Sequence, residues 1–214
     1  KEQYVGWGAG SALFEQMQWL RGPANLLMDI ASDCEEVYAL ADLLLEKRIL
    51  PMIEIAVEAG ADVVGFTDDW GTQKQLLINP KSWRKLYKPR YQKMFDLVHQ
   101  GGALAWMHSD GMTMDIIPDW IEIGLNVLNP QFSCMDMVTI QKICDGKLCI
   151  AGDIDRQWTL PSGTPDQVRE YIRKVTKVFG SPQGGFIYQL GLEDTPIENA
   201  EAAFETIYQA RSLS

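Results

Sequence analysis

Three residues able to do chemistry, His108, Ser109 and Asp110, are followed by Gly111 and end an apolar stretch that begins at Ala103. The apolar stretch favours a buried strand, and His-Ser-Asp-Gly is typical of a turn leaving the carboxyl end of that strand. An imidazole can act as a general acid or base near neutral pH, or bind a metal through a neutral ring nitrogen. His108 is one of only two histidines, so we expect chemistry at this strand end.

Carboxylates and amides follow the other expected strands in the same way. They are Asp68, Asp69, Asn129, Gln131, Asp153, Asp155, Gln157, Gln189 and Glu193. An aspartate after a strand is commonly a helix cap or a turn former, so each residue alone has a structural explanation. Ligands of α/β proteins bind at the carboxyl ends of parallel strands, where all these residues would gather. Several carboxylates in one cleft need a cation, an arginine or a basic substrate beside them.

A metal site is one interpretation of this pattern. His108 and Asp110, two residues apart at a strand end, can reach one ion together with Asp69 or Glu193 from other strands. Oxygen-rich ligation favours magnesium, manganese or iron over zinc. The alternative is a histidine that only hydrogen-bonds a neighbouring strand end. His99 lies in the last turn of an expected helix, where a structural role is expected.

Two further side-chain patterns leave alternatives open. Trp70 and Trp106, with Phe66 and Trp158, either wall an apolar pocket for a flat ligand or simply pack in the core and its rim. Ser109 follows His108 directly, and adjacent strand residues point to opposite faces. A direct serine–histidine pair is therefore not expected.

The strand-end residues are positioned by an alternation of strands and helices. The six expected strands are Tyr4–Gly10, Ala61–Thr67, the strand from Ala103 to His108, Leu125–Leu128, Leu148–Gly152 and Phe186–Leu190. Strands that alternate with helices predict right-handed crossovers and a parallel sheet. No G-x-G-x-x-G follows any of them, which argues against a dinucleotide-binding sheet. We therefore favour a single-domain (β/α) barrel, residues 1–214, without its first two βα units in this chain.

Helix starts and stops are marked by local signals. The motif Ser32-Asp33-Cys34-Glu35 has the form of a capping box and would start a long helix that reaches Glu58, kinked or broken near Pro51. Asn79-Pro80 and Thr164-Pro165-Asp166-Gln167 combine a cap with proline in the first turn. Pro89 is expected to interrupt the helix that follows Asn79.

Composition excludes several classes of protein. In 214 residues, 29 acidic side chains outnumber 19 basic ones, a net charge of −10, which disfavours nucleic-acid binding. No apolar run has the length of a membrane span and no leader opens the chain, so we expect a soluble, cytoplasmic protein with no membrane partner. The four cysteines form no C-x-x-C pair, which fits free thiols in a reducing compartment.

Several motifs together resemble the uroporphyrinogen decarboxylase superfamily. They are Glu58-Ala59-Gly60-Ala61-Asp62, Asp68-Asp69-Trp70-Gly71, His108-Ser109-Asp110-Gly111, Gly152-Asp153-Ile154-Asp155, and Gln189-Leu190-Gly191 with Thr195-Pro196-Ile197-Glu198-Asn199. The resemblance runs from about Trp7 to Ala210. It implies a TIM-type (β/α)8 barrel, of which this chain would hold strands three to eight, and it places the chain among haem-pathway decarboxylases and corrinoid-dependent methyltransferases.

The resembling motifs differ from the family pattern at informative positions. The methyltransferases bind zinc through a His-x-Cys-Gly turn, and Asp110 stands where that cysteine would be. No cysteine occurs near Gly191, where the family has a further thiolate. The decarboxylase closes its last strand with Asn-Leu-Gly-His, whereas this chain has Leu192 in place of the histidine. A divalent metal is thus expected, with zinc less favoured because its cysteine ligands are missing.

Three functions follow from the resemblance. The first is transfer of a methyl group between a small substrate and a corrinoid protein or cofactor; His108 and Asp69 would be catalytic, and His108, Asp110 and Glu193 would bind metal. Asp68, Trp70, Asp153 and Gln189 would contact the substrate. The second is decarboxylation of uroporphyrinogen in tetrapyrrole biosynthesis, which an acidic site disfavours because that substrate carries many carboxylates. The third is a non-catalytic barrel that binds a ligand or partner, and a homodimer is left open.

Overall fold

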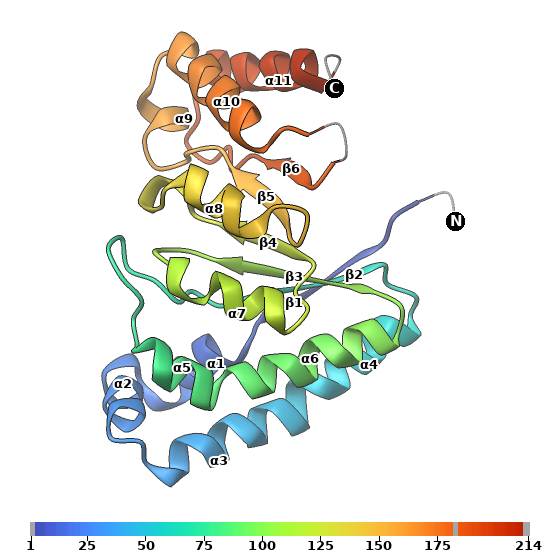
Figure 1. Ribbon diagram of the computed structural model, residues 1–214, viewed down its shortest axis with the longest axis vertical. Helices are drawn as coiled ribbons and strands as arrows, with labels where there is room; N and C mark the ends of the chain where they lie inside the picture. Colours follow the sequence, from blue (N-terminus) through green and yellow to red (C-terminus); the bar gives the residue numbers. More distant parts are fainter. Residues whose placement is uncertain (1–2, 182–183, 212–214) are drawn as a thin grey trace. The chain divides into compact units, whose positions relative to one another are not determined.

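A computed structural model describes residues 3–181 and 184–211 of the chain. The strands are β1 (Gly6–Ser11), β2 (Val63–Thr67), β3 (Leu104–Ser109), β4 (Val127–Pro130), β5 (Cys149–Asp153) and β6 (Phe186–Gln189). They follow one another in the sheet in sequence order, and helices connect them (Figure 1). All six overlap the expected strands, so the predicted α/β class is confirmed. The arrangement fits part of a (β/α) barrel.

The helices fill the intervals between the strands. They are α1 (Leu13–Arg21), α2 (Pro23–Ala31), α3 (Glu35–Leu44), α4 (Leu50–Glu58), α5 (Pro80–Leu86), α6 (Lys88–Gln100), α7 (Ile117–Glu122), α8 (Met137–Cys144), α9 (Thr159–Ser162), α10 (Pro165–Phe179) and α11 (Ile197–Arg211). A π-helical turn η1 (Leu45–Ile49) and two 3₁₀ turns, η2 (Met114–Ile116) and η3 (Phe132–Cys134), complete the set. Within the described residues, no helix is both long and apolar enough to cross a bilayer.

The chain divides into two compact units, residues 1–128 and 129–214. The amino-acid sequence shows no linker at this division, and the single domain expected from it has no boundary there. The four cysteines are free thiols. Burial raises the pKa of the Cys144 thiol to about 12, so this cysteine stays protonated and packs as a small apolar side chain.

In the first unit, β2 pairs in parallel with both β1 and β3, and alternation of side chains gives the sheet two different faces. One face carries Val64 and Phe66, fully or almost fully buried, and helices α4 and α6 pack against these strands (Figure 1). The Phe66 ring lies 6.3 Å from the ring of Phe95 in α6. The opposite face carries Thr67 of β2, whose register partner in β3 is His108. We call this opposite face the site face.

The capping box expected at Ser32 does not form. Helix α3 begins at Glu35 with Cys34 as its N-cap and has no side-chain cap. The Ser32 hydroxyl instead donates to the Met28 carbonyl at 2.9 Å and so closes the preceding helix α2. Asp33 takes a left-handed backbone conformation, φ 56°, which redirects the chain between the two helices. The signal was therefore a helix end rather than a helix start.

Pro51 and Pro89 interrupt their helices as the sequence predicts. Before Pro51 the helix widens into the π turn η1, and α4 starts at Leu50 with the proline in its first turn. A π turn shifts the hydrogen-bond ladder, and the helix can therefore accommodate a proline, which has no N–H to donate. Pro89 stands in the first turn of α6, directly after the end of α5. Asn79 caps α5 by accepting a hydrogen bond from the Lys81 amide at 2.8 Å, as expected.

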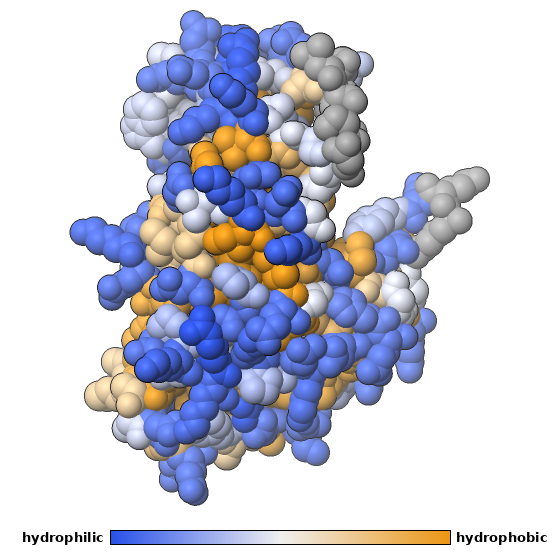
Figure 2. Space-filling model, viewed as in Figure 1, coloured by the Kyte–Doolittle hydropathy of each residue, from blue (hydrophilic) through white to orange (hydrophobic). Residues whose placement is uncertain are grey.

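The second unit pairs β5 with β6 in parallel and packs α10 against α11 and α8 (Figure 1). The buried face of α10 consists of Val168, Ile172, Val175 and Phe179. Its outward face is mainly hydrophilic in Figure 2. The predicted capping box at Thr164 and Gln167 is confirmed, since each side chain bonds the backbone amide of the other residue. Burial of the apolar face and this cap together account for the helix.

Candidate functional site

His108, Asp69 and Asp110 form one cluster at the carboxyl ends of β2 and β3. The imidazole Nε2 of His108 lies 3.5 Å from Asp110 Oδ1 and 3.8 Å from Asp69 Oδ1. One ligand atom from each of the three half-buried residues lies within 4.8 Å of the other two. The structure therefore brings together three of the residues that the sequence singles out for catalysis or metal binding.

The backbone holds the two loops of the cluster together. The Asp110 amide donates to Asp69 Oδ1 at 2.9 Å, and the Gly71 amide donates to the Asp110 carbonyl at 3.2 Å. Gly111 has φ +82°, and a Cβ atom on it would lie 2.2 Å from the carbonyl carbon of Gly71. A Cβ on Gly71 would lie 2.3 Å from the Met112 amide nitrogen. Both loops therefore need glycine where their backbones touch, which explains the last residue of each motif.

Asp68, next to the cluster, is fully buried and anchors helix α1. Its Oδ2 accepts from the Phe14 amide at 2.9 Å and its Oδ1 from the Glu15 amide at 2.8 Å. The Tyr91 hydroxyl also donates to it. Burial raises the pKa of Asp68 to about 7, and the three hydrogen bonds oppose that rise. A substrate contact was predicted for Asp68, but its carboxylate faces helices α1 and α6 and not solvent.

Trp70 belongs to the core of the first unit. Its ring is fully buried, stacks on Phe14 with 4.2 Å between centroids, and meets Tyr87 edge-on at 4.6 Å. Its Nε1 donates to the Tyr91 hydroxyl at 3.3 Å. Of the two interpretations left open for this tryptophan, the structure supports core packing. The substrate contact predicted for Trp70 has no exposed ring surface to use in this conformation.

Two other expectations in the first unit are confirmed. Ser109 is buried on the face opposite His108, and its hydroxyl accepts from the Trp70 amide at 3.1 Å. The buried side chains of Asp68, Trp70 and Ser109 therefore hold the loop that follows β2 from the side opposite the site face. The second histidine, His99, places Nε2 2.8 Å from Asn126 Oδ1, which itself accepts from the Ala105 amide at 2.7 Å. His99 thus serves the structure, as expected for its place at the end of α6.

Glu15 and Thr67 lie near the cluster and were not predicted to take part. Thr67 Oγ1 lies 3.4 Å from Glu15 Oε2 and 3.4 Å from Ser11 Oγ. Register places Ser11, Thr67 and His108 side by side on the site face. Glu15 brings a further carboxylate to this row. The only signal in the sequence is a glutamate in the first helical turn after a glycine-ended strand, which is too common to be specific.

The remaining predicted site residues belong to the second unit. Asp153 at the end of β5 is buried and forms a 2.8 Å ion pair with Arg156 Nη1. Gln189, the register partner of Asp153, is exposed at the end of β6, and Glu193 is exposed in the following loop. Among the described residues, the Asp69–His108–Asp110 cluster consists of first-unit residues, and a metal-ligand role for Glu193 stays a prediction. The predicted substrate contacts of Asp153 and Gln189 also stay predictions.

Asp155, two residues after Asp153, is a helix cap. Its carboxylate accepts from the Gln157 amide at 3.0 Å, from the Thr159 amide at 3.1 Å and from the Thr159 hydroxyl at 2.8 Å. These bonds satisfy the first turn of α9. The structural explanation given for an aspartate after a strand thus holds for this residue.

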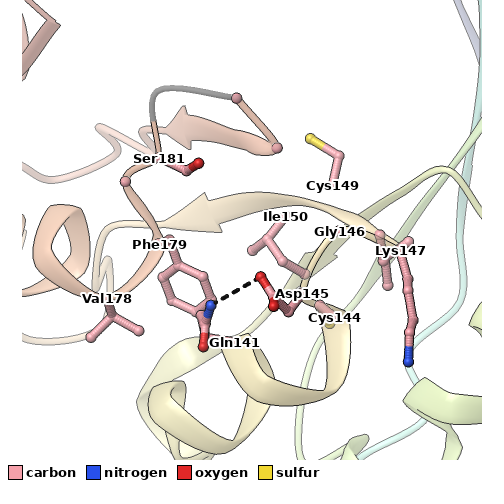
Figure 3. A pocket seen from close by; sticks show the side chains of 14 residues that line it. Gln141, Cys144, Asp145, Gly146, Lys147, Cys149, Ile150, Val178, Phe179 and Ser181 are labelled. Atoms are coloured by element: carbon pink, nitrogen blue, oxygen red, sulfur yellow. Dashed lines mark hydrogen bonds between the residues drawn. The ribbon is translucent and has the colours of Figure 1, made fainter. Parts of the chain in front are cut away.

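A cavity of about 550 Å³ occupies the other end of the second unit's strands (Figure 3). It is lined by residues from the end of α8, the start of β5 and the loop before β6, among them Gln141, Cys144, Lys147, Cys149 and Ser181. Gln141 donates to Asp145 at 3.4 Å across its rim. Because ligands of α/β sheets bind at the carboxyl ends of strands, we do not assign this cavity to the site.

Comparison with known proteins gives one family. The model of the family described as uroporphyrinogen decarboxylase (URO-D) matches residues 8–210. A curated uroporphyrinogen decarboxylase from Chlorobium phaeobacteroides is 24% identical over 160 residues, which are 71% of this chain and 43% of that protein. The chain thus spans less than half the length of this relative.

Solved structures share the fold. A methyltransferase from Methanosarcina mazei superposes with a TM-score of 0.78 at 18% identity, over 98% of this chain and 59% of that one. A dihydropteroate synthase from Anaplasma phagocytophilum gives a TM-score of 0.59 at 13% identity, over 98% of this chain and 76% of that one. A B12-independent methionine synthase from Shewanella gives a TM-score of 0.59 at 10% identity, over 100% of this chain and 62% of that one. At these identities the likeness establishes the fold alone.

Proposed function

The chain belongs to the uroporphyrinogen decarboxylase family. We propose that it acts in the enzymatic transfer of a methyl group between a small substrate and a corrinoid protein or cofactor. The observation that carries the proposal is the Asp69–His108–Asp110 cluster at the strand ends. The family resemblance includes both decarboxylases and methyltransferases, and the Methanosarcina protein whose fold the chain shares is a methyltransferase. The reaction itself is our proposal.

The donor set of the cluster fits a divalent metal ion. Two ligand atoms at about 2.0–2.2 Å from one ion lie about 2.8–3.6 Å apart for octahedral to tetrahedral angles. The 3.5 Å between His108 Nε2 and Asp110 Oδ1 meets this range, and the 3.8 Å to Asp69 Oδ1 needs only a small side-chain rotation. One imidazole and two carboxylates suit manganese, iron or zinc and leave positions for substrate. Glu193 remains the proposed further ligand.

Each residue of the cluster has a proposed task. A metal ion held by His108, Asp110 and Asp69 would act as a Lewis acid that lowers the pKa of a bound oxygen, nitrogen or sulfur atom of the substrate. Without such an ion, His108 flanked by two carboxylates can itself hold or release a proton. Asp68 and Tyr91 keep the β2 loop in place from the buried side. Asp153 and Gln189 are the proposed contacts to the rest of the substrate.

Decarboxylation of uroporphyrinogen is the second candidate. The curated relative at 24% identity carries that name, which favours it. The charge of the site opposes it, since Asp69, Asp110 and Glu15 lie where a substrate with many carboxylates would have to bind. Methyl transfer meets no such repulsion, so we place it first.

Titration of the full-length protein with Mn²⁺ and Zn²⁺ by calorimetry tests the metal site. We expect one tight site that His108→Ala abolishes. His99→Gln is the matched control because it changes the second histidine, which lies in the last turn of α6 and is bonded to Asn126. Circular dichroism verifies that both variants fold. Equal metal affinity in His108→Ala and the unmodified protein would remove the metal from the proposal.

Two activity assays separate the candidate reactions. Loss of the methyl group from methylcobalamin, followed by absorbance with small thiols, alcohols and amines as acceptors, reports methyl transfer. Release of carbon dioxide from uroporphyrinogen reports decarboxylation and would replace our first candidate by the second. A folded, full-length protein that turns over in neither assay but copurifies with a partner would support the non-catalytic barrel instead.

A further inference from the structure

Two glycines lie beside Trp106 on the site face of the first unit. The parallel register pairs Gly8 with Gly65 and Gly65 with Trp106. Because neighbouring strand residues in register point to the same face, these three positions share the face of Thr67 and His108. They form the row directly before the row of Ser11, Thr67 and His108. The helix-facing side of the same strands carries Phe66 and its neighbours instead.

The two glycines leave open space on the site face, and their backbone conformation does not require glycine. A Cβ atom on Gly8 would meet no atom within 4 Å, and one on Gly65 would meet only the Trp7 carbonyl oxygen at 3.8 Å, an ordinary contact. Neither glycine has a positive φ. Gly71 and Gly111, by contrast, are needed for a close backbone approach. The inward layers of a (β/α) barrel are normally filled by bulky side chains, and we call the open space over these two glycines the hollow.

The dimensions of the hollow suit a single ring. Adjacent strands lie about 4.8 Å apart, and alternate residues of one strand lie about 6.7 Å apart. Two neighbouring glycines therefore leave an uncovered area about the size of one six-membered ring. Trp106 is half-buried and flanks this area with the only aromatic ring in the row. An aromatic ring placed there packs against the indole in an offset or edge-on arrangement. A substituent of that ring reaches the next row, which holds His108.

Charge restricts the ligand further. Asp69 and Asp110 flank His108, and the Glu15 carboxylate lies beside Thr67 in the same row. This row repels a carboxylate and accepts a hydroxyl or amino group, either directly or through a metal ion. We propose that the hollow over Gly8 and Gly65, flanked by Trp106, binds a planar, single-ring aromatic molecule without negative charge, whose polar substituent meets the Asp69–His108–Asp110 cluster. The inference rests on the proposed function, since it defines the substrate class of the same site.

Fluorine NMR of the full-length protein labelled with 5-fluorotryptophan tests the ligand class. The variant Trp106→Phe assigns the resonance of Trp106, since this chain alone holds seven tryptophans. Phenol is the probe, cyclohexanol tests the need for a planar ring, and benzoate tests the charge. We expect phenol to shift the Trp106 resonance saturably, and benzoate and cyclohexanol to bind at least about tenfold more weakly. Benzoate binding as tightly as phenol, or no saturable shift with phenol, overturns the proposal.

Filling the hollow tests its position. Gly65→Val places a side chain in the open space, and we expect it to weaken phenol binding at least about tenfold. Gly6→Val is the matched control, since it lies on the same face one row further from His108 and its Cβ makes an ordinary 3.5 Å contact with Val63. Unchanged phenol affinity in Gly65→Val, with the fold verified by circular dichroism, overturns the proposal and indicates that another part of the full-length protein covers the glycines.

The metal titration separates this inference from the proposed function. We expect Gly65→Val to bind Mn²⁺ as the unmodified protein does, because no metal ligand is altered. Normal Mn²⁺ binding with no phenol site refutes the aromatic ligand alone. Phenol binding at Trp106 without any metal binding or methyl transfer supports the hollow and refutes the proposed function.

Discussion

At the end of β3 the Asp110 carboxylate lies 3.5 Å from the imidazole of His108, whereas at the end of β5 the Asp153 carboxylate lies 2.8 Å from the guanidinium of Arg156. Both strands end in a similar sequence, a carboxylate close to a second polar residue. The β5 carboxylate is neutralised by a permanent cation of its own unit. The β3 carboxylate faces a group that is cationic only when protonated, together with a second carboxylate, Asp69.

The comparison shows what makes a strand-end carboxylate available for binding. An aspartate that caps a helix, as Asp155 does, has its acceptor oxygens committed to the fold, and one paired with arginine, as Asp153 is, has its charge already balanced. Asp69 and Asp110 instead lie around an imidazole, and the three side chains are the donor set of the proposed metal site. A motif of carboxylates after a strand therefore favours a cation site only where the neighbouring strand supplies a histidine or further carboxylates instead of a basic residue.

The largest expected difference between the two units concerns their strand-end tryptophans. Trp70→Ala empties the fully buried aromatic cluster of the first unit and should lower the free energy of unfolding by about 3–5 kcal/mol. Trp158 is 54% exposed, so Trp158→Ala should change it by less than about 0.5 kcal/mol. Urea unfolding followed by circular dichroism measures both. Equal losses would mean that Trp158 is buried by something other than the described residues.

Metal affinity provides the next test. Structural zinc sites share roughly 10–16 kcal/mol among four ligands, so Asp110→Ala should weaken Mn²⁺ binding on the order of 100-fold. Asp153→Ala should leave it unchanged, because Asp153 is paired with Arg156. Calorimetry on the two folded variants gives the ratio. A large loss with Asp153→Ala would join the two strand ends in one site and contradict the distinction drawn between them.

Two adjacent carboxylates should differ in how they couple stability to pH. Burial raises the pKa of Asp68 from 3.8 to about 7, so between these values the folded chain holds a proton that the unfolded chain has released. Stability therefore falls as pH rises through this window, by about 2 kcal/mol from pH 5 to pH 8 for this group. Asp68→Asn should remove that slope from urea-unfolding curves.

Asp69→Asn is the control for the pH dependence, since it changes the adjacent carboxylate, which is half-buried and belongs to the Asp69–His108–Asp110 cluster. The slope that Asp68→Asn removes should still be present in Asp69→Asn. If the slope disappears in Asp69→Asn and persists in Asp68→Asn, the pH dependence does not arise from Asp68 and the prediction is wrong.

The smallest expected difference concerns the two capping motifs. Thr164→Ala removes a cap that bonds the Gln167 amide and should cost about 1 kcal/mol. Ser32→Ala removes a hydroxyl that bonds only preceding carbonyls, and we expect a loss of a few tenths of a kcal/mol. Thermal unfolding ranks the two. A larger loss at Ser32 would show that this serine does more than close α2.

The sequence predicts the strands and the first-unit cluster well because both depend on local patterns. Apolar runs that end in polar turns locate β2 and β3, and parallel strands bring Asp69, His108 and Asp110 to one edge. The misassigned motif at Ser32 is also local. Its residue types fit a helix start, but the left-handed conformation of Asp33 separates α2 from α3.

Residues whose roles depend on distant partners were harder to assign. Asp68 and Asp69 look equivalent in the sequence, and only alternation across the strand end separates the buried anchor from the cluster residue. The Tyr91 hydroxyl that completes the anchor comes from α6, and nothing near Asp68 in the sequence indicates it. Arg156 likewise could have pointed either way, and its pairing with Asp153 follows from three-dimensional packing.

The contact between Gly71 and Gly111 also bears on how the chain reaches its native state. The two backbones, 40 residues apart, fit together only when β3 is aligned on β2 as observed. A slip of one residue would turn His108 to the helix side and bring Asp110 or Met112, each with a side chain, against Gly71. Such a misaligned chain cannot close the two loops. The close approach of the two glycines is therefore compatible only with the observed strand register, and the same register brings Asp69, His108 and Asp110 together.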